Sequence, residues 1–341
     1  MPYGGAGLTD FFDTCYASLM LQDRAIAETI RAVDESHSEQ LRQGERIILM
    51  GCGDSYAVAS YGRWCLLAAG IDSVHLSPSE IGYTPVDDGT LVIGVTASGR
   101  SVAVLDALRQ AREQGAKIIV LTDNAEGAAS KMADDVWVTR SGASTYDTSP
   151  SSPTTAAMAY LLTLTASIVE TRQEEVRDDI GVLEHQGSEV MSWAKEEGRK
   201  MAEMVDVDHP VYVISEGANH AAAQIGMMKF NEYSLVRGIA AVREEFRHHY
   251  NLSVDVGDRA ILITDSPPTD EDRVYLEVLS HTLRMSAYHL WTPVEIGLHT
   301  PPAQAIPNAI ALQFAAYFSA VKWNPDKTSF KEPNASAFRI Y

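Results

Sequence analysis

Cysteine is scarce in this chain of 341 residues, which contains only Cys15, Cys52 and Cys65. The number is odd and no pair has the CxxC spacing, so the sequence argues against a disulfide framework and against a structural zinc site. We therefore expect no bound metal, and the reducing cytoplasm is the location that fits such free thiols best.

Basic residues are also few, because 27 Lys and Arg stand against 46 Asp and Glu, for a net charge of -19. A surface of this sign repels nucleic acid and anionic membranes, so neither is expected as a partner. The apolar runs are all well short of the roughly 18 residues that a membrane helix needs. The N-terminus lacks a basic stretch followed by an apolar core, so we expect no secretory signal.

One local pattern is present twice, at residues 47–56 and again 164 residues later at 211–220. In each copy an apolar run stops at glycines and enters an alanine-rich helix, which is the strand–turn–helix half of a βαβ unit. The chain is long enough for two domains. We therefore predict two α/β halves in tandem, with the chemistry at the carboxyl ends of the strands, where helix N-termini hold anions.

Alternating strand and helix patterns predict a parallel sheet with helices on both faces in each half. Strands are expected at 46–50, 73–76, 90–95, 117–121 and 135–138 in the first half, and at 210–214, 259–263 and 286–290 in the second. Helices are expected at 10–43, 55–69, 101–114, 152–171 and 306–322. The resulting divisions are an N-terminal helical segment 1–45, a first domain 46–171, a helical connector 172–207, a second domain 208–322 and a tail 323–341.

The first candidate site is the turn Gly51-Cys52-Gly53-Asp54-Ser55-Tyr56. A GxG after a strand, with Glu80 after the next strand where a ribose ligand would sit, suggests a dinucleotide site. Tyr56 stands where the third glycine of GxGxxG belongs, so the pattern is weak and we expect no cofactor. The alternative is a hydroxyl-lined anion pocket with Ser55 at the helix N-terminus.

The second candidate, Thr96-Ala97-Ser98-Gly99-Arg100-Ser101, favours that alternative. It follows an apolar strand and opens a helix. The glycine lets backbone N–H groups approach a phosphate, the hydroxyls donate, and the helix dipole favours negative charge. An ordinary N-cap needs one hydroxyl, whereas this loop has three.

The second half contains Lys229-Phe230-Asn231-Glu232, followed by Glu244-Glu245-Phe246-Arg247-His248-His249. Lys229 and Glu232 share a helix face, and such a pair is commonly a surface ion pair. The histidines have no acidic or histidine partner at a zinc-like spacing, so an exposed loop is a simpler interpretation of them than a metal site.

Together these segments resemble the sugar isomerase (SIS) domain family, in particular the tandem isomerase half of glucosamine-6-phosphate synthase and its stand-alone relatives. The first turn is similar to the family's Cys-Gly-Thr-Ser-Tyr, the pair Ser79-Glu80 to its Ser-Glu, and residues 96–101 to its phosphate loop Ser-Gln-Ser-Gly-Glu-Thr. Residues 229–232 resemble Lys-Leu-Lys-Glu and residues 245–248 resemble Glu-Leu-Lys-His. Glu232 and His248 are 16 residues apart, as in the family.

The resemblance implies two flavodoxin-like SIS domains of about five strands each, binding a phosphosugar. It implies that Glu232 is the isomerisation base, that His248 opens the sugar ring and that Lys229 assists them. It also implies a homodimer in which His248 completes the partner's site. The implied phosphate ligands are Ser55, Thr96, Ser98 and Ser101, and weaker matches to substrate-binding positions are Gly53, Glu80, Ser151, Ser152 and Lys331.

The implied activity is isomerisation with deamination, from glucosamine 6-phosphate to fructose 6-phosphate and ammonia. Ala97 and Arg100 depart from the family's Gln and Glu, which keeps deglycation of phosphorylated fructosamines as an alternative. A non-catalytic sugar-phosphate sensor is a second alternative, although a sensor would not need the Glu232 and His248 pair. Pro2 stands where a nucleophilic cysteine would be needed, so we expect no glutamine-dependent synthesis by this chain.

Overall fold

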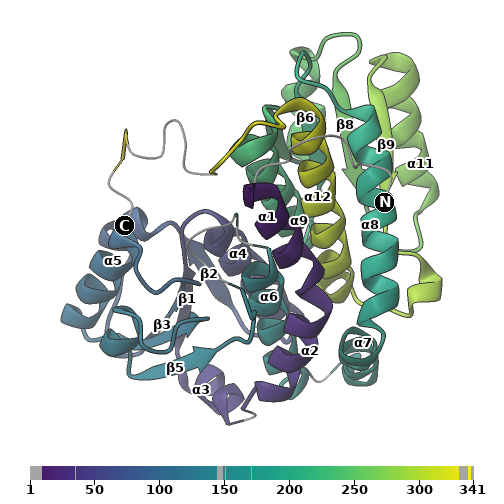
Figure 1. Ribbon diagram of the computed structural model, residues 1–341. Coiled ribbons are helices and arrows are strands. Elements are labelled where there is room, and N and C mark those ends of the chain that lie inside the picture. Colours follow the sequence, from purple (N-terminus) through teal and green to yellow (C-terminus); the bar gives the residue numbers. More distant parts are fainter. Residues whose placement is uncertain are drawn as a thin grey trace.

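Two parallel β-sheets form the framework of the computed structural model, which describes residues 10–34, 36–143, 149, 151–169, 171–329 and 337–338 (Figure 1). The first sheet has the order β2-β1-β3-β4-β5 and the second the order β7-β6-β8-β9. The strands are β1 Arg46–Met50, β2 Ser73–Leu76, β3 Thr90–Val95, β4 Lys117–Thr122, β5 Asp135–Val138, β6 Val211–Ser215, β7 Gly238–Val242, β8 Arg259–Ile263 and β9 Ser286–Leu290. The first order is that of a flavodoxin-like sheet.

Both faces of each sheet are covered, because successive residues of a strand enter different clusters of buried side chains. In β1, Ile47 and Leu49 belong to a cluster that continues through both halves, whereas Ile48 and Met50 pack with α5 (Val102–Glu113) on the opposite face. Burial on both faces is why these strands read as continuous apolar runs. The predicted α/β fold is thereby confirmed.

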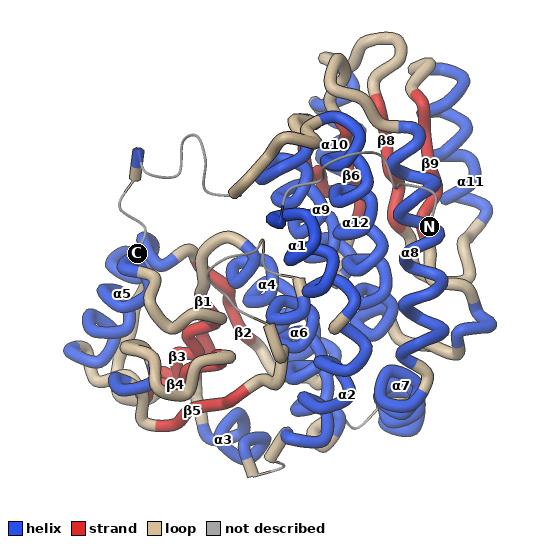
Figure 2. Tube along the Cα trace, viewed as in Figure 1, coloured by secondary structure: helices blue, strands red, loops and turns tan. Residues whose placement is uncertain are grey.

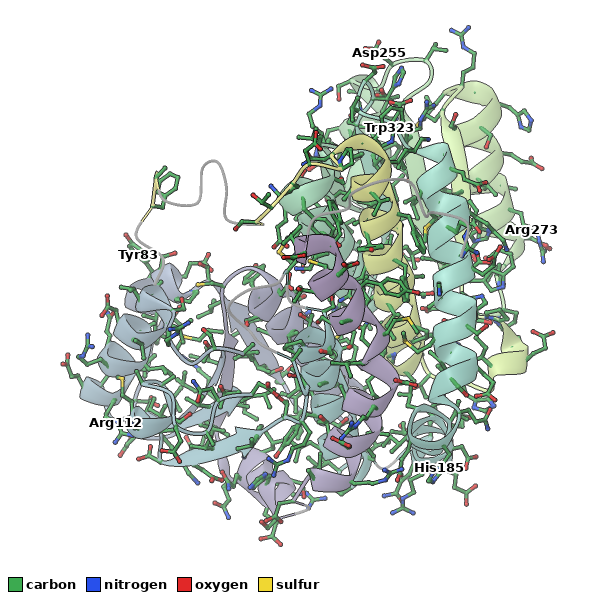
Figure 3. The ribbon with its side chains drawn as sticks, viewed as in Figure 1. Tyr83, Arg112, His185, Asp255, Arg273 and Trp323 are labelled. Atoms are coloured by element: carbon green, nitrogen blue, oxygen red, sulfur yellow. The ribbon has the colours of Figure 1, made fainter. Side chains whose placement is uncertain are left out.

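The helices connect the two halves as well as covering the sheets (Figure 2). Their bounds are α1 Asp10–Met20, α2 Gln22–Ala32, α3 His37–Gln43, α4 Asp54–Ala68, α6 Ser152–Ala166, α7 Gln173–His185, α8 Gly187–Met204, α9 Asn219–Lys229, α10 Arg243–His248, α11 Asp270–Glu277 and α12 Pro301–Trp323. Helix α12 packs on α8 and α9, α1 on α12, and α2 on α6, α7 and α8, while α4 of the first half packs on α9 of the second. In Figure 3 the labelled Tyr83 and Arg112 lie on the first half, and Asp255 and Arg273 on the second.

Several expected boundaries are wrong. The single helix expected at 10–43 is three helices, with one break at Leu21 and another after Ala32. At the second break Val33 adopts extended backbone and the Asp34 carboxylate accepts a hydrogen bond from the Ser36 N–H. Helix α12 begins at Pro301 rather than at 306, since proline is tolerated in a first helical turn. The second sheet has four strands instead of about five.

Strand β7 was not expected at all. It is an edge strand of five residues, mostly half-buried, that begins with Gly238. Within the described ranges, no helix is both long enough and apolar enough to cross a membrane.

Candidate functional site

The carboxyl ends of β1 and β3, which are neighbours in the first sheet, bring the two hydroxyl-bearing loops together. At the end of β1 the chain turns sharply into α4, and a Cβ on Gly51 would lie 2.5 Å from the backbone carbonyl of Ser55. Gly53 has a φ of +56°, the left-handed region that glycine adopts without strain. The Ser101 hydroxyl donates to Cys52 Sγ at 3.8 Å, which joins the loops directly.

The loop after β3 is held by its own hydroxyls. Thr96 and Ser98 are buried, and their side-chain oxygens accept hydrogen bonds from the backbone N–H groups of Gly99 and Arg100 at 3.2 and 3.3 Å. Ser101 precedes the first residue of α5. Together with Ser55 in the first turn of α4, the four predicted phosphate ligands therefore lie at the same edge of one sheet, at two helix N-termini.

Lys229 lies at the centre of a buried ionic cluster. Its side chain is fully buried, and Nζ is 2.6 Å from Asp54 Oδ2 and 3.0 Å from Glu232 Oε2. Glu232 lies in a π-helical turn, Phe230–Ser234, that continues α9, and such turns are frequent at functional sites. The interpretation of Lys229 and Glu232 as a surface ion pair is therefore wrong.

Two hydroxyls complete the cluster. The Ser149 hydroxyl donates to Glu232 Oε2 at 2.6 Å, and the Thr154 hydroxyl donates to Asp54 Oδ2 at 3.0 Å. In each acid the oxygen that accepts from the hydroxyl is also the one that contacts Lys229, and these hydrogen bonds fix the orientation of the carboxylate.

Burial and charge act against each other in this cluster. Burial raises the pKa of Asp54 to about 6, with Lys229 opposing the shift and Glu232 adding to it. Burial alone would lower the pKa of Lys229, but the Asp54 and Glu232 carboxylates outweigh it and raise that pKa. Lys229 is therefore a charged ammonium, and the cluster has one cation for two acids. Cys15 borders it, and burial raises the pKa of this thiol to about 11.

His248 lies apart from this cluster within one chain. It is the last residue of α10, its side chain is 71% exposed, and Nε2 lies 3.1 Å from Glu244 Oε1. Among the described residues, no hydrogen bond or ion pair joins His248 to Lys229 or Glu232.

The weaker predicted substrate-binding residues lie in varied surroundings. Glu80 is exposed, and its carboxylate accepts a 2.7 Å hydrogen bond from the Ser77 N–H in a capping box. Ser151 directly precedes α6 and is buried. Ser152 is also buried, and its hydroxyl has no hydrogen-bond partner among the described residues. Lys331 lies outside the described residues.

Three residues of the cluster were missed from the sequence: Asp54, Ser149 and Thr154. Asp54 could have been noticed in the sequence, because an acidic residue there replaces the threonine of the family turn Cys-Gly-Thr-Ser-Tyr. Ser149 lies in the hydroxyl-rich stretch 140–153, which is typical of a surface loop. In the described part of the chain, no group of three or more His, Cys, Asp and Glu side chains is placed to hold a metal ion.

A separate cavity of about 500 Å³ opens near the carboxyl end of the second sheet, lined among others by Trp64, Leu162 and Gly217. Its lining is mainly apolar. Pro301 and Pro302 border it at the start of α12, and neither has a backbone N–H to offer an anion. The lining also includes Thr171, Arg172 and Thr300, so the cavity is mainly apolar but contains hydrogen-bond donors.

The comparisons with known proteins agree with this arrangement. The family model of the SIS domain matches residues 40–169. A glutamine–fructose-6-phosphate aminotransferase (isomerizing) of Sulfurisphaera tokodaii is 26% identical over 319 residues, which are 89% of this chain and 53% of that protein. The chain thus spans about half the length of this curated relative.

Solved structures share the whole fold. The C-terminal domain of glucosamine-fructose-6-phosphate aminotransferase from Francisella tularensis superposes with a TM-score of 0.74 and 17% identity, over 90% of this chain and 94% of that one. Glucosamine-6-phosphate deaminase from Thermotoga maritima gives a TM-score of 0.71 and 17% identity, over 92% and 97% of the two chains.

The class that these comparisons define is the SIS domain, which residues 40–169 of this chain match, and both sheets of the chain have the parallel α/β fold of such domains. Within that class it resembles the isomerase half of the aminotransferase and the stand-alone deaminase.

Proposed function

We propose that this chain is an aldose–ketose isomerase of sugar phosphates, with Glu232 as the base. The observation that supports this most directly is the position of the Glu232 carboxylate, 3.0 Å from a buried ammonium that also contacts Asp54 at 2.6 Å. Asp54 is adjacent in sequence to Ser55 of the phosphate turn. A proton-transfer group is thereby fixed beside the loops suited to hold a phosphate.

In the proposed mechanism the phosphate is bound away from the reacting carbons by Ser55, Thr96, Ser98 and Ser101. Glu232 removes the proton from C2 of the open-chain aldose and returns it to C1, through an enediol or enolamine. The Lys229 ammonium orients the carboxylate and stabilises negative charge that develops on the substrate oxygen. Proton transfer by a positioned group contributes about 10²–10⁴-fold to the rate.

The substrate that we propose is glucosamine 6-phosphate. With an amino group at C2, proton transfer to C1 produces an imine at C2. Water adds to this imine and ammonia leaves, which yields fructose 6-phosphate. A relative of the same fold is a glucosamine-6-phosphate deaminase, which supports the proposal.

Ring opening is proposed to use His248 of a second copy of the chain in a homodimer. Its imidazole would move a proton between O1 and O5. The 71% exposure of its side chain supports this, because a group that serves a neighbouring subunit must point outward. We also propose the division into an N-terminal helical segment 1–45, SIS domains 46–171 and 208–322, a connector 172–207 and a tail 323–341.

The test is incubation of the purified protein with glucosamine 6-phosphate, followed by assays of ammonia and fructose 6-phosphate. Glu232→Gln and His248→Ala should each lose about 10²-fold or more of the activity. His249→Ala is the matched control, because this neighbouring histidine is also exposed, at 54%, and should retain activity.

Two results would redirect the proposal. Binding of the sugar phosphate without turnover would favour deglycation, for which the departures at Ala97 and Arg100 leave room, or a sensor role. Absence of binding to any sugar phosphate would contradict the phosphate assignment of residues 96–101.

A further inference from the structure

The Asp54 carboxylate links the two halves of the molecule at the candidate site. Asp54 is the first residue of α4, directly after the turn from β1, whereas Lys229 is the last residue of α9 in the second half. Their 2.6 Å ion pair therefore crosses the contact between α4 and α9. Because Lys229 also contacts Glu232 at 3.0 Å, a continuous ionic chain joins the phosphate turn to the proposed base.

The surroundings of Asp54 differ from those of an acid that only stabilises a helix N-terminus. Such acids are commonly solvent-exposed near the first turn. The side chain of Asp54 is only 10% exposed, and its Oδ1 is buried without a hydrogen-bond partner among the described residues. A buried oxygen left unpaired costs stability, so its retention calls for a functional explanation.

We propose that Asp54 is a positioning residue. It holds Lys229 between two carboxylates and so keeps the Glu232 carboxylate in a fixed position relative to the phosphate-binding turn. The inference rests on the proposed function, since it assigns a role to Asp54 within the same site. Phosphate bound at Ser55 fixes the turn and with it the adjacent Asp54. The ammonium, and through it the Glu232 carboxylate, is then aligned with the sugar carbons.

Sharing of the ammonium has a second effect. The Lys229 ammonium is shared between Asp54, at 2.6 Å, and Glu232, at 3.0 Å, so the Glu232 carboxylate does not hold this cation alone. With an uncharged side chain at position 54, Lys229 would pair with Glu232 alone. That closer pair would turn the Glu232 carboxylate away from the orientation that proton transfer needs.

The kinetic test uses Asp54→Asn, which preserves shape and removes the charge. We expect kcat to fall by about 10²-fold while KM stays within a factor of about 3, because the phosphate ligands are untouched. The matched control is Asp272→Asn, which removes another buried carboxylate, paired with Arg243 in the second half. Unchanged kcat in Asp54→Asn, or an equal loss in both variants, would overturn the proposal.

If Asp54→Asn does not fold, Thr154→Val provides the second variant. It removes the hydroxyl that donates to Asp54 at 3.0 Å and leaves every charge in place. We expect a smaller loss of kcat, about 10-fold, again without a matching change in KM. A Thr154→Val protein with the kcat of the wild type would count against the positioning role.

A measurement independent of turnover separates this inference from the proposed function. In protein labelled with ¹⁵N-lysine, the ammonium signal of Lys229 is assigned by its loss in Lys229→Met and followed as inorganic phosphate is added. The signal should shift in the wild type and remain still in Asp54→Asn. A Lys229 signal that does not move at saturating phosphate overturns the coupling, whereas a wild type without turnover overturns only the proposed activity.

Discussion

Asp54→Asn should make the protein more stable at neutral pH, even though we expect it to lower the proposed activity. The pKa of Asp54 is raised from 3.8 to about 6, chiefly by burial, so the native state holds this proton more tightly than the unfolded chain. The stability that results is fully present below about pH 4 and is lost as the pH rises through about 6. Asparagine does not ionise, so the variant avoids the loss.

The size of the effect follows from the same shift. A pKa raised from 3.8 to about 6 corresponds to about 3 kcal/mol of unfolding free energy above pH 7. For 341 residues, an unfolding entropy of about 2.1 cal/mol/K per residue converts this to an increase of about 4 °C in Tm. Thermal unfolding of both proteins between about pH 4 and pH 8 measures the difference directly.

A second buried carboxylate serves as the control with the opposite sign. Burial acts to raise the pKa of Asp272, but hydrogen bonds from Thr269 and Arg243 outweigh it and lower that pKa. The Asp272 carboxylate therefore stabilises the fold at neutral pH and loses this effect in acid. Asp272→Asn should have a lower free energy of unfolding than the wild type near pH 7, and the difference between the two proteins should shrink as the pH falls. If Asp54→Asn also behaves in this way, the ion pair with Lys229 outweighs burial and our reasoning is wrong.

Three further substitutions test other parts of the structure. Gly51→Ala would place Cβ 2.5 Å from the Ser55 backbone, so it should distort the turn and weaken binding of phosphosugars, measured by calorimetric titration, as well as stability. Gly198→Ala would place Cβ 2.4 Å from the Phe314 Cβ, so helices α8 and α12 must separate; we expect a loss of about 1–3 kcal/mol in urea unfolding with little change in KM. Lys229→Met leaves the nearly buried Asp54 carboxylate and the 28% exposed Glu232 carboxylate without their cation, at a cost of about 3–5 kcal/mol near pH 8 that shrinks in acid, measured by thermal unfolding.

The sequence predicted the strands well whether or not their burial is complete. Strands β1 and β3 were located to the residue because parallel strands covered on both faces read as unbroken apolar runs. The partly exposed β2, β5 and β9 were located to the residue as well, from the alternation of strand and helix patterns. Strand β7, Gly238–Val242, escaped notice because its glycine and two alanines do not form an apolar run that stands out in the sequence. The early start of α12 was hidden by Pro301 and Pro302, which a first helical turn accepts.

The candidate site was predictable where its residues follow strands, and less so where it depends on tertiary contact. Thr96 and Ser98 directly follow a strand, so their convergence with Ser55 could be inferred from the strand order of such sheets. The spacing of Lys229 and Glu232 predicts a shared helix face but not its burial. The partner of Lys229 is 175 residues away in sequence, and no local pattern indicates that pair.

The ion pair between Asp54 and Lys229 also has a consequence for the order of folding. The strands of each sheet come from one half of the chain, whereas this contact forms only after α4 has docked on α9. In refolding from denaturant, the helical circular dichroism signal should therefore return before catalysis, because segments close in sequence find one another sooner than distant ones. The interval between the two recoveries sets an upper limit on the time that the halves take to dock, because assembly of the proposed homodimer falls within it as well.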